Sequence, residues 1–278
     1  MIKGNNLTIK KSKHKGIKMN ELLATVFGFS VIFLATTLGA SLVFAFRKDF
    51  SAKSNSIFVG VAAGIMLAAS VWSLILPSID GAESYGAFRF LPALIGILVG
   101  GAFLHLTEKA TAKLIAESGE KGDGKYVKAT KMFIAITVHN IPEGLAVGFA
   151  FGAAVVVGTS DAYVAALGLA VGIAIQNFPE GAAVSLPLKD VTKNKFSAFL
   201  YGVASGAIEP IMALCGYFTA SVLSAYQPWF LSFAAGAMIF VVADDLIPES
   251  KLDSSPHIGT WAFVAGFAIM MVLDVAFG

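Results

Sequence analysis

The sequence predicts an all-α integral membrane protein in which eight transmembrane helices form one bundle with a metal site inside it. Three observations point to this fold class. Of the 278 residues, 56% are hydrophobic and only 14% are charged, whereas an ordinary soluble protein carries about a quarter charged residues. The apolar residues lie in long blocks, and about 20 consecutive apolar residues cross the hydrocarbon core of a bilayer. No block alternates with a period of two, as the strands of a membrane barrel would.

Polar breaks in the sequence set the ends of the eight apolar blocks. The predicted spans cover residues 22–46, 57–79, 88–106, 132–157, 162–186, 196–223, 229–248 and 258–277. Each must be helical, because backbone amides and carbonyls in lipid have no water and bond within their own segment. The first block is too long for the apolar core of a signal peptide. The chain is therefore predicted to form one transmembrane domain over residues 19–278, preceded by a polar basic tail at 1–18.

Basic residues in the connecting segments predict the orientation. The segments after the first, third, fifth and seventh spans carry 13 lysines and arginines, whereas those after the second, fourth and sixth carry only Arg89. Because positively charged loops stay in the cytoplasm, both termini are predicted outside, in an inner or plasma membrane. The six lysines of the tail at 1–18 oppose this orientation, and Met19 offers a second start for the chain.

Charge and cysteine content exclude several classes of protein. The formal net charge is +2 and the lysines lie in short clusters, so no sustained basic face exists and nucleic acid is not an expected partner. Cys215 is the only cysteine, which rules out an intramolecular disulfide and a thiolate metal cluster. Glycines at four-residue spacing, such as Gly60 and Gly64, predict close helix packing in the bilayer. The expected partners are lipid and divalent metal ions, and a homodimer is left open.

Two neighbouring spans contain the same short motif at mid-membrane depth. The fourth span carries HNIPEG at 139–144, and the fifth carries QNFPEG at 176–181. A charged carboxylate at this depth costs about 2.5–3.5 kcal/mol even on the scale that gives the smallest penalty. A partner must offset that cost. The match predicts two related helices that face each other, and membrane transporters place their binding sites between such repeats.

Helical spacing gathers the polar groups of each motif on one face, since residues three or four apart are neighbours. The candidate ligands at mid-membrane depth are His139, Asn140, Glu143, Gln176, Asn177, Glu180 and Glu209, with Met66 as a weak sulfur ligand. Pro142 and Pro179 each leave a backbone carbonyl four residues earlier without its amide partner. Imidazole, carboxylate and amide ligands together are typical of a borderline divalent transition metal.

Charge balance also favours a bound cation. The ionised carboxylates of Glu143, Glu180 and Glu209 would repel one another and resist desolvation, so some should hold protons when no metal is bound. Two divalent cations would bring four positive charges against these three negative ones. A two-metal site is therefore electrostatically reasonable, and metal is expected to exchange for protons.

The paired motifs resemble the signatures of the fourth and fifth helices of the ZIP family of zinc and iron permeases, in particular its bacterial members. The resemblance covers nearly the whole chain from the first span. It implies eight helices, outward termini and uptake of metal toward the cytoplasm. Zinc is the leading substrate that it implies, and Fe²⁺, Mn²⁺, Co²⁺ and Cd²⁺ are further candidates.

The resemblance also implies two metal positions. The first would take His139, Glu143, Gln176, Glu180 and Met66. The second would take Asn140, Glu143, Asn177, Glu180 and Glu209, with the two shared glutamates bridging the ions. Some relatives have aspartate where this chain has Asn177, and a neutral amide weakens the second position.

Further acidic and polar residues mark a path through the membrane. Ser73 and Asp80 on the second span are candidates for the outer mouth. Asp244 and Asp245, near the inner end of the seventh span, are candidate exit ligands. Asp274, near the outer end of the eighth span, is interpreted as a solvated terminus.

The leading function is a carrier that exposes a bound metal alternately to each side of the membrane. A metal-selective channel with the same ligands is the nearest alternative, and saturable flux would favour the carrier. An intramembrane metalloenzyme is disfavoured, because the chain has no HExxH arrangement and the candidate ligands exceed the usual three protein ligands of catalytic zinc. The chain is therefore not expected to be an enzyme.

Overall fold

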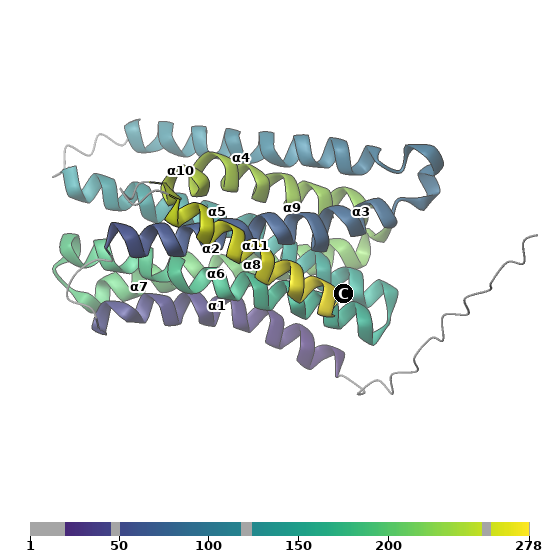
Figure 1. The fold of residues 1–278 in the computed structure, drawn as a ribbon, viewed down its shortest axis with the longest axis horizontal. Coiled ribbons are helices and arrows are strands. Elements are labelled where there is room, and N and C mark those ends of the chain that lie inside the picture. Colours follow the sequence, from purple (N-terminus) through teal and green to yellow (C-terminus); the bar gives the residue numbers. More distant parts are fainter. Residues whose placement is uncertain (1–19, 46–50, 118–123, 252–256, 278) are drawn as a thin grey trace, which may run out of the picture.

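The computed structural model describes residues 20–45, 51–117, 124–251 and 257–277, which form a bundle of helices (Figure 1). The helices are α1 (Glu21–Ala45), α2 (Ala52–Ala69), α3 (Leu76–Asp80), α4 (Leu91–Glu117), α5 (Gly124–Val157), α6 (Ser160–Thr192), α7 (Lys195–Gly206), α8 (Ile208–Val222), α9 (Gln227–Val241), α10 (Ile247–Ser250) and α11 (Ile258–Phe277). No strand occurs among these residues. The start of α1 and the end of α11 lie toward the same end of the bundle.

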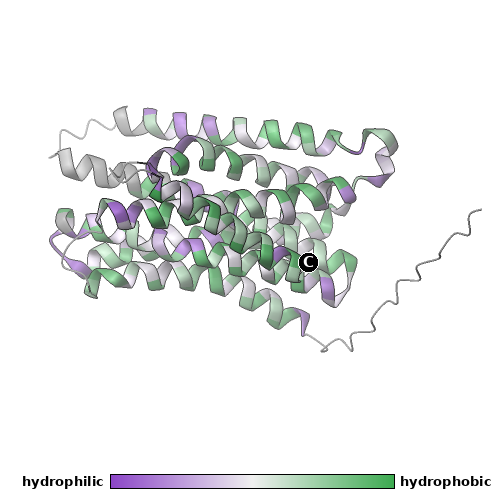
Figure 2. Ribbon diagram, viewed as in Figure 1, coloured by the Kyte–Doolittle hydropathy of each residue, from purple (hydrophilic) through white to green (hydrophobic). Residues whose placement is uncertain are grey.

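The predicted fold class is confirmed. Eight stretches of the described chain are long and apolar enough to cross a membrane. They are Glu21–Ala45, Ala52–Asp80, Leu91–Lys113, Ile136–Val157, Ser160–Lys189, Lys195–Val222, Ser224–Ser250 and Ile258–Ala276. Hydrophobic residues colour these helices along most of their length, and hydrophilic residues gather toward the two ends of the bundle (Figure 2). The chain is thus a multi-pass membrane protein.

Several span boundaries differ from the prediction for local reasons. The third span begins at Leu91, because Glu83–Phe88 forms a 3₁₀ turn in which Gly86 has a φ of 57°. Its helix α4 then continues to Glu117, well past the predicted end at 106. The sixth span is two helices, α7 and α8, and Pro210 lies in the first turn of α8, where its missing amide hydrogen breaks no helical bond.

The second and seventh spans each contain a π-helical turn that the sequence did not predict. The turn η1 (Ser70–Ile75) joins α2 to α3, and η4 (Val242–Leu246) joins α9 to α10. A proline follows each turn, at the start of α3 and of α10. Insertions of this kind often occur at functional sites, because they redirect side chains out of the regular helical order. Here η4 carries the acidic pair of the seventh span.

Glycines bring particular pairs of helices into backbone contact, as their spacing predicted. A Cβ atom on Gly64 of α2 would lie 2.1 Å from the Phe263 carbonyl oxygen of α11. The same holds for Gly100 of α4, at 2.0 Å from the Phe233 carbonyl oxygen of α9. Comparable seams join α1 to α6 and α5 to α8. Only glycine permits these approaches, which take the place of hydrophobic association inside lipid.

The seams divide the helices into two groups. The first helix group is α1, α5, α6, α7 and α8, and the second is α2, α3, α4, α9, α10 and α11 with η1 and η4. Every glycine in the described residues whose Cβ would meet the backbone of another helix meets one of its own group. Between groups, Gly172 of α6 instead faces the flexible end of the Met270 side chain of α11. Glycine-mediated backbone contacts therefore occur within each group, whereas at Gly172 the two groups meet through a side chain.

Candidate metal site

The two motifs face each other on α5 and α6. Both helices continue through their internal prolines, Pro142 and Pro179, and they pack side by side. Gln176 Nε2 donates a hydrogen bond of 2.8 Å to Glu143 Oε1, and both side chains are 0% exposed. The carboxylate of Glu180 is close enough to that of Glu143 for the two to interact electrostatically. The predicted meeting of the paired motifs is therefore confirmed.

A second cluster forms around Glu209, at the start of α8. Glu209 Oε1 accepts hydrogen bonds from Thr36 Oγ1 of α1 at 2.9 Å and from Asn140 Nδ2 of α5 at 3.1 Å. Glu209 Oε2 accepts one from Asn177 Nδ2 of α6 at 2.5 Å. These interactions connect α1, α5, α6 and α8, all members of the first helix group. The break between α7 and α8 places Glu209 in this contact at mid-span.

Several buried oxygen atoms in the same region have no hydrogen-bond partner. They are Asn140 Oδ1, Glu143 Oε2, Gln176 Oε1, Asn177 Oδ1 and Glu180 Oε2. A buried polar atom without a partner costs about 1–3 kcal/mol, and more when it is charged. Native structures keep few such atoms. Oxygens of two carboxylates and three amides on adjacent helices are the donor set that a divalent cation would satisfy.

His139 points from α5 toward the second helix group. Its Nε2 atom lies 3.4 Å from Glu108 Oε1 of α4 and 3.3 Å from Asp245 Oδ2 of η4. These three side chains can place ligand atoms within 4.8 Å of one another. His139 is also within electrostatic range of Glu180. The imidazole thus lies between the mid-membrane oxygens and a carboxylate pair on the other group.

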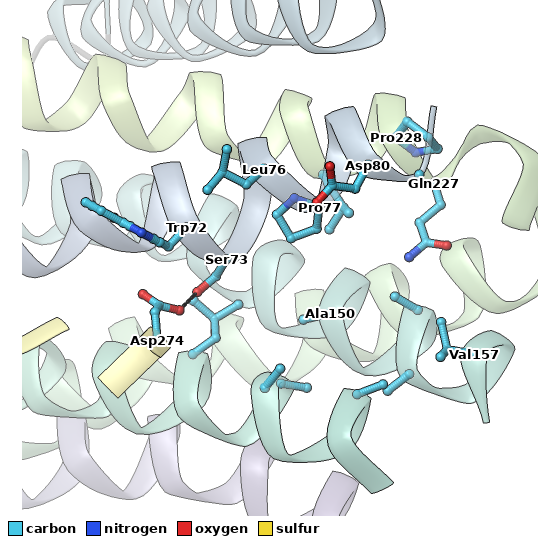
Figure 3. Close-up of a pocket in the computed structure, with 18 of the residues that line it drawn as sticks. Trp72, Ser73, Leu76, Pro77, Asp80, Ala150, Val157, Gln227, Pro228 and Asp274 are labelled. Carbon is cyan, nitrogen blue, oxygen red and sulfur yellow. Dashed lines mark hydrogen bonds between the residues drawn. The ribbon is translucent and has the colours of Figure 1, made fainter. Parts of the chain in front are cut away.

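A cavity of about 670 Å³ lies between the two helix groups at the end of the bundle that carries Asp80. Figure 3 shows Ser73 and Asp274 hydrogen-bonded to each other at this cavity, with Asp80 and Gln227 farther along it. The α5 and α6 residues that line it are mainly alanines, such as Ala153.

The interpretation of Asp274 as a solvated terminus is wrong, because its side chain is half-buried and its Oδ2 atom has no partner.

Comparison with known proteins places the chain among metal transporters. The family described as ZIP zinc transporter matches residues 107–274. The chain is 34% identical to human zinc transporter ZIP11, with 92% of this chain and 97% of the relative aligned. It is 37% identical to zinc transporter ZIPB of Bordetella bronchiseptica over 91% of this chain and 81% of the relative, and 34% identical to zinc transporter GufA of Myxococcus xanthus over 88% and 95%.

The chain belongs to the ZIP zinc transporter family. Membership confirms the resemblance carried by the paired motifs and supports metal transport. It also agrees with the prediction that the chain is a transporter and not an enzyme.

This ZIP protein brings together most of the residues that its sequence singled out. Asn140, Glu143, Gln176, Asn177 and Glu209 are all 0% exposed at the contact of the first helix group. The remaining candidates are more dispersed. Met66 is fully buried in the apolar core on α2, Asp245 faces His139, and Asp80 and Asp244 are exposed.

Two polar residues that contact the candidate ligands of this ZIP protein were not predicted from the sequence. Thr36 lies in an apolar span, where a lone threonine usually bonds its own helix, and it does contact the Ile32 carbonyl oxygen. Glu108 follows the predicted end of the third span among charged residues. The sequence analysis ended this span at residue 106, whereas α4 continues as a helix to Glu117 and so brings Glu108 alongside α5.

Proposed function

We propose that this ZIP protein carries a divalent transition metal, zinc first, across the bilayer through a site between α5 and α6. The observation that carries the proposal is the set of five unpartnered buried oxygens on these two adjacent helices. Two of them belong to glutamates whose charge at mid-membrane depth must be offset. A dehydrated divalent cation would satisfy the oxygens and the charges together.

The chemistry of the ligand atoms narrows the choice of metal but does not select a single ion. Carboxylate and amide oxygens with one imidazole, His139, suit zinc and also Fe²⁺, Mn²⁺ and Co²⁺, and a buried thioether such as Met66 would favour the softer Cd²⁺. Zinc is proposed because the relatives quoted above are named zinc transporters. The other four ions remain substrates to be tested alongside it.

The proposed path runs from the cavity to the carboxylate pair beside His139. The cavity opens at the end of the bundle near Asp80, which the distribution of basic residues puts outside. At the other side of the motifs, Glu108 and Asp245 offer acidic ligands beside His139. Movement in this direction is uptake toward the cytoplasm.

Alternating access is proposed to arise from relative movement of the two helix groups. Backbone-to-backbone seams hold each group together, whereas the cavity and the His139 contacts lie between the groups. Packed backbones resist sliding, while side-chain interfaces repack between discrete arrangements. The mid-membrane oxygens all belong to the first group, so a bound ion would travel with that group.

The test is zinc uptake into proteoliposomes that contain the purified protein. Replacing Glu143 or Glu180 with Ala is expected to reduce uptake to the level of empty liposomes, because each change removes a charged ligand oxygen. Asp161→Ala is the matched control, since Asp161 is an exposed acidic residue in the first turn of α6. Uptake by both glutamate variants at the wild-type rate would refute the proposed site. Flux that never saturates with zinc would favour the channel.

A further inference from the structure

We propose that Glu209 is a positioning residue that orients two amide ligands toward a single cation, and that it does not ligate a second one. This inference rests on the proposed transport function and deepens it. It differs from the two-metal site that the family resemblance implies, in which Glu209 would be a direct ligand.

Both oxygens of the Glu209 carboxylate already have hydrogen-bond partners in the protein. Its Oε1 atom accepts from Thr36 Oγ1 and Asn140 Nδ2, which uses both lone pairs of that oxygen. Its Oε2 atom accepts from Asn177 Nδ2 at 2.5 Å. Neither oxygen of Glu209 is among the buried atoms without a partner, in contrast with Glu143 and Glu180. A metal at Oε1 would have to displace two donors, and one at Oε2 would have to share that oxygen with the Asn177 amide.

The two asparagine side chains can be oriented in only one way. Asn140 Nδ2 donates to the Ser205 carbonyl oxygen at 3.0 Å as well as to Glu209, so both hydrogens of the amide have acceptors. Asn177 Nδ2 likewise has the Ile32 carbonyl oxygen at 3.4 Å in addition to Glu209. Rotating either amide by half a turn would set its oxygen against two other oxygens. Both amide oxygens are thus fixed on the side away from Glu209.

Gln176 follows the same rule on the opposite side of the site. Its Nε2 atom donates to Glu143 Oε1, and its Oε1 atom has no partner. All three buried amides therefore turn nitrogen toward a carboxylate and leave oxygen free. Carboxylates that orient the true ligands of a metal in this way are a general feature of metal sites, and their loss usually costs about 10–100-fold in affinity or activity.

Charge balance then suits one ion. Of the three mid-membrane glutamates, only Glu143 and Glu180 have an oxygen without a partner, because both oxygens of Glu209 accept from neutral donors. The two negative charges that a cation would contact directly match one divalent ion, while the charge of Glu209 is stabilised by its three hydrogen-bond donors. Asn177 is decisive here, because an aspartate at this position would have no hydrogen to donate to Glu209 and would add a fourth buried carboxylate.

The experiment measures zinc bound per chain in the detergent-purified protein, by equilibrium dialysis against Zn²⁺ and elemental analysis. The wild type is expected to bind one ion. Glu209→Gln should still bind one ion, about 10-fold more weakly, because the orientation of Asn177 is lost while the ligands remain. Asn177→Asp should bind two ions, because facing carboxylates at 177 and 209 attract a second cation. Thr36→Val is the matched control, since it removes a donor to Glu209 without touching either amide, and it should keep one ion.

Two results would overturn the inference while leaving transport in place. They are two zinc ions in the wild type with one lost in Glu209→Gln, or an unchanged single ion of unchanged affinity in Glu209→Gln. Wild-type protein that binds no zinc and shows no uptake would instead refute the proposed function. If Asn177→Asp does not fold, as judged by size-exclusion chromatography, the comparison of wild type with Glu209→Gln still decides.

Discussion

At the scale of single residues, spacing along a helix identified ligand faces but could not identify partners from other helices. The i, i+3 and i+4 pattern placed His139, Asn140 and Glu143 on one helix face. In the structure these side chains have different partners, which are Glu108 for His139, Glu209 for Asn140 and Gln176 for Glu143. Thr36 and Glu209, however, are 173 positions apart in the chain. Neither residue carries a local pattern that indicates the other, so their contact follows from the fold alone.

Glu108 provides a residue-scale prediction for the proposed inner end of the path. Glu108→Gln is expected to lower the initial rate of zinc uptake by about 10-fold, because the amide keeps an acceptor near His139 Nε2 but loses the negative charge. The measurement is uptake into proteoliposomes, with Glu83→Gln as the control, since Glu83 is exposed in the turn between α3 and α4. Equal rates for the two variants would exclude Glu108 from the path.

At the scale of elements, the eight spans were predictable because lipid demands long apolar helices, while their interruptions were not. Hydropathy averages over a span, so it does not register the π-helical turns η1 and η4. The prolines Pro77 and Pro248 were visible in the sequence, yet a proline alone also fits an ordinary kink. The same averaging hid the break between α7 and α8, which sets the position of Glu209.

Adjacent glycines on α4 allow a matched test of a packing seam. Gly100→Ala is expected to destabilise the protein by about 1–3 kcal/mol, because the new Cβ would lie 2.0 Å from the Phe233 carbonyl oxygen and the helices must separate. Gly101→Ala should have little effect, since its nearest atom would be 3.6 Å away. Thermal unfolding in detergent compares the two variants with wild type. Equal midpoints for both alanine variants would show that α4 and α9 are not held by this seam.

At the scale of the whole molecule, the sequence predicted the fold class but not the division into two helix groups. Glycine spacing indicates that a helix has a close neighbour, without saying which helix that is. The partner of α2 turned out to be α11, and the partner of α1 turned out to be α6. The unpartnered oxygens of the motifs all belong to the first helix group, while the carboxylates facing His139 belong to the second.

Movement between the groups predicts a change in access to the cavity. In a Cys215→Ser background, Ala153→Cys on α5 should react with a membrane-impermeant thiol reagent added outside, because Ala153 lines the cavity. Zinc should slow this reaction if loading favours closure of the cavity. Val155→Cys is the control, since Val155 lies on the same helix outside the cavity. Labelling from the cytoplasmic side only would contradict the predicted orientation, and labelling indifferent to zinc would contradict closure.

The position of His139 has a thermodynamic consequence. Its Nε2 atom has one lone pair or one proton, so it cannot ligate a metal ion while it is protonated and paired with Glu108 or Asp245. An ion that takes this nitrogen must break a contact between the two helix groups. Part of the free energy of metal binding is then used to break that contact. By thermodynamic linkage, the metal affinity differs between the arrangement with the contact and the arrangement without it. Metal binding and movement of the two helix groups would thus be thermodynamically coupled.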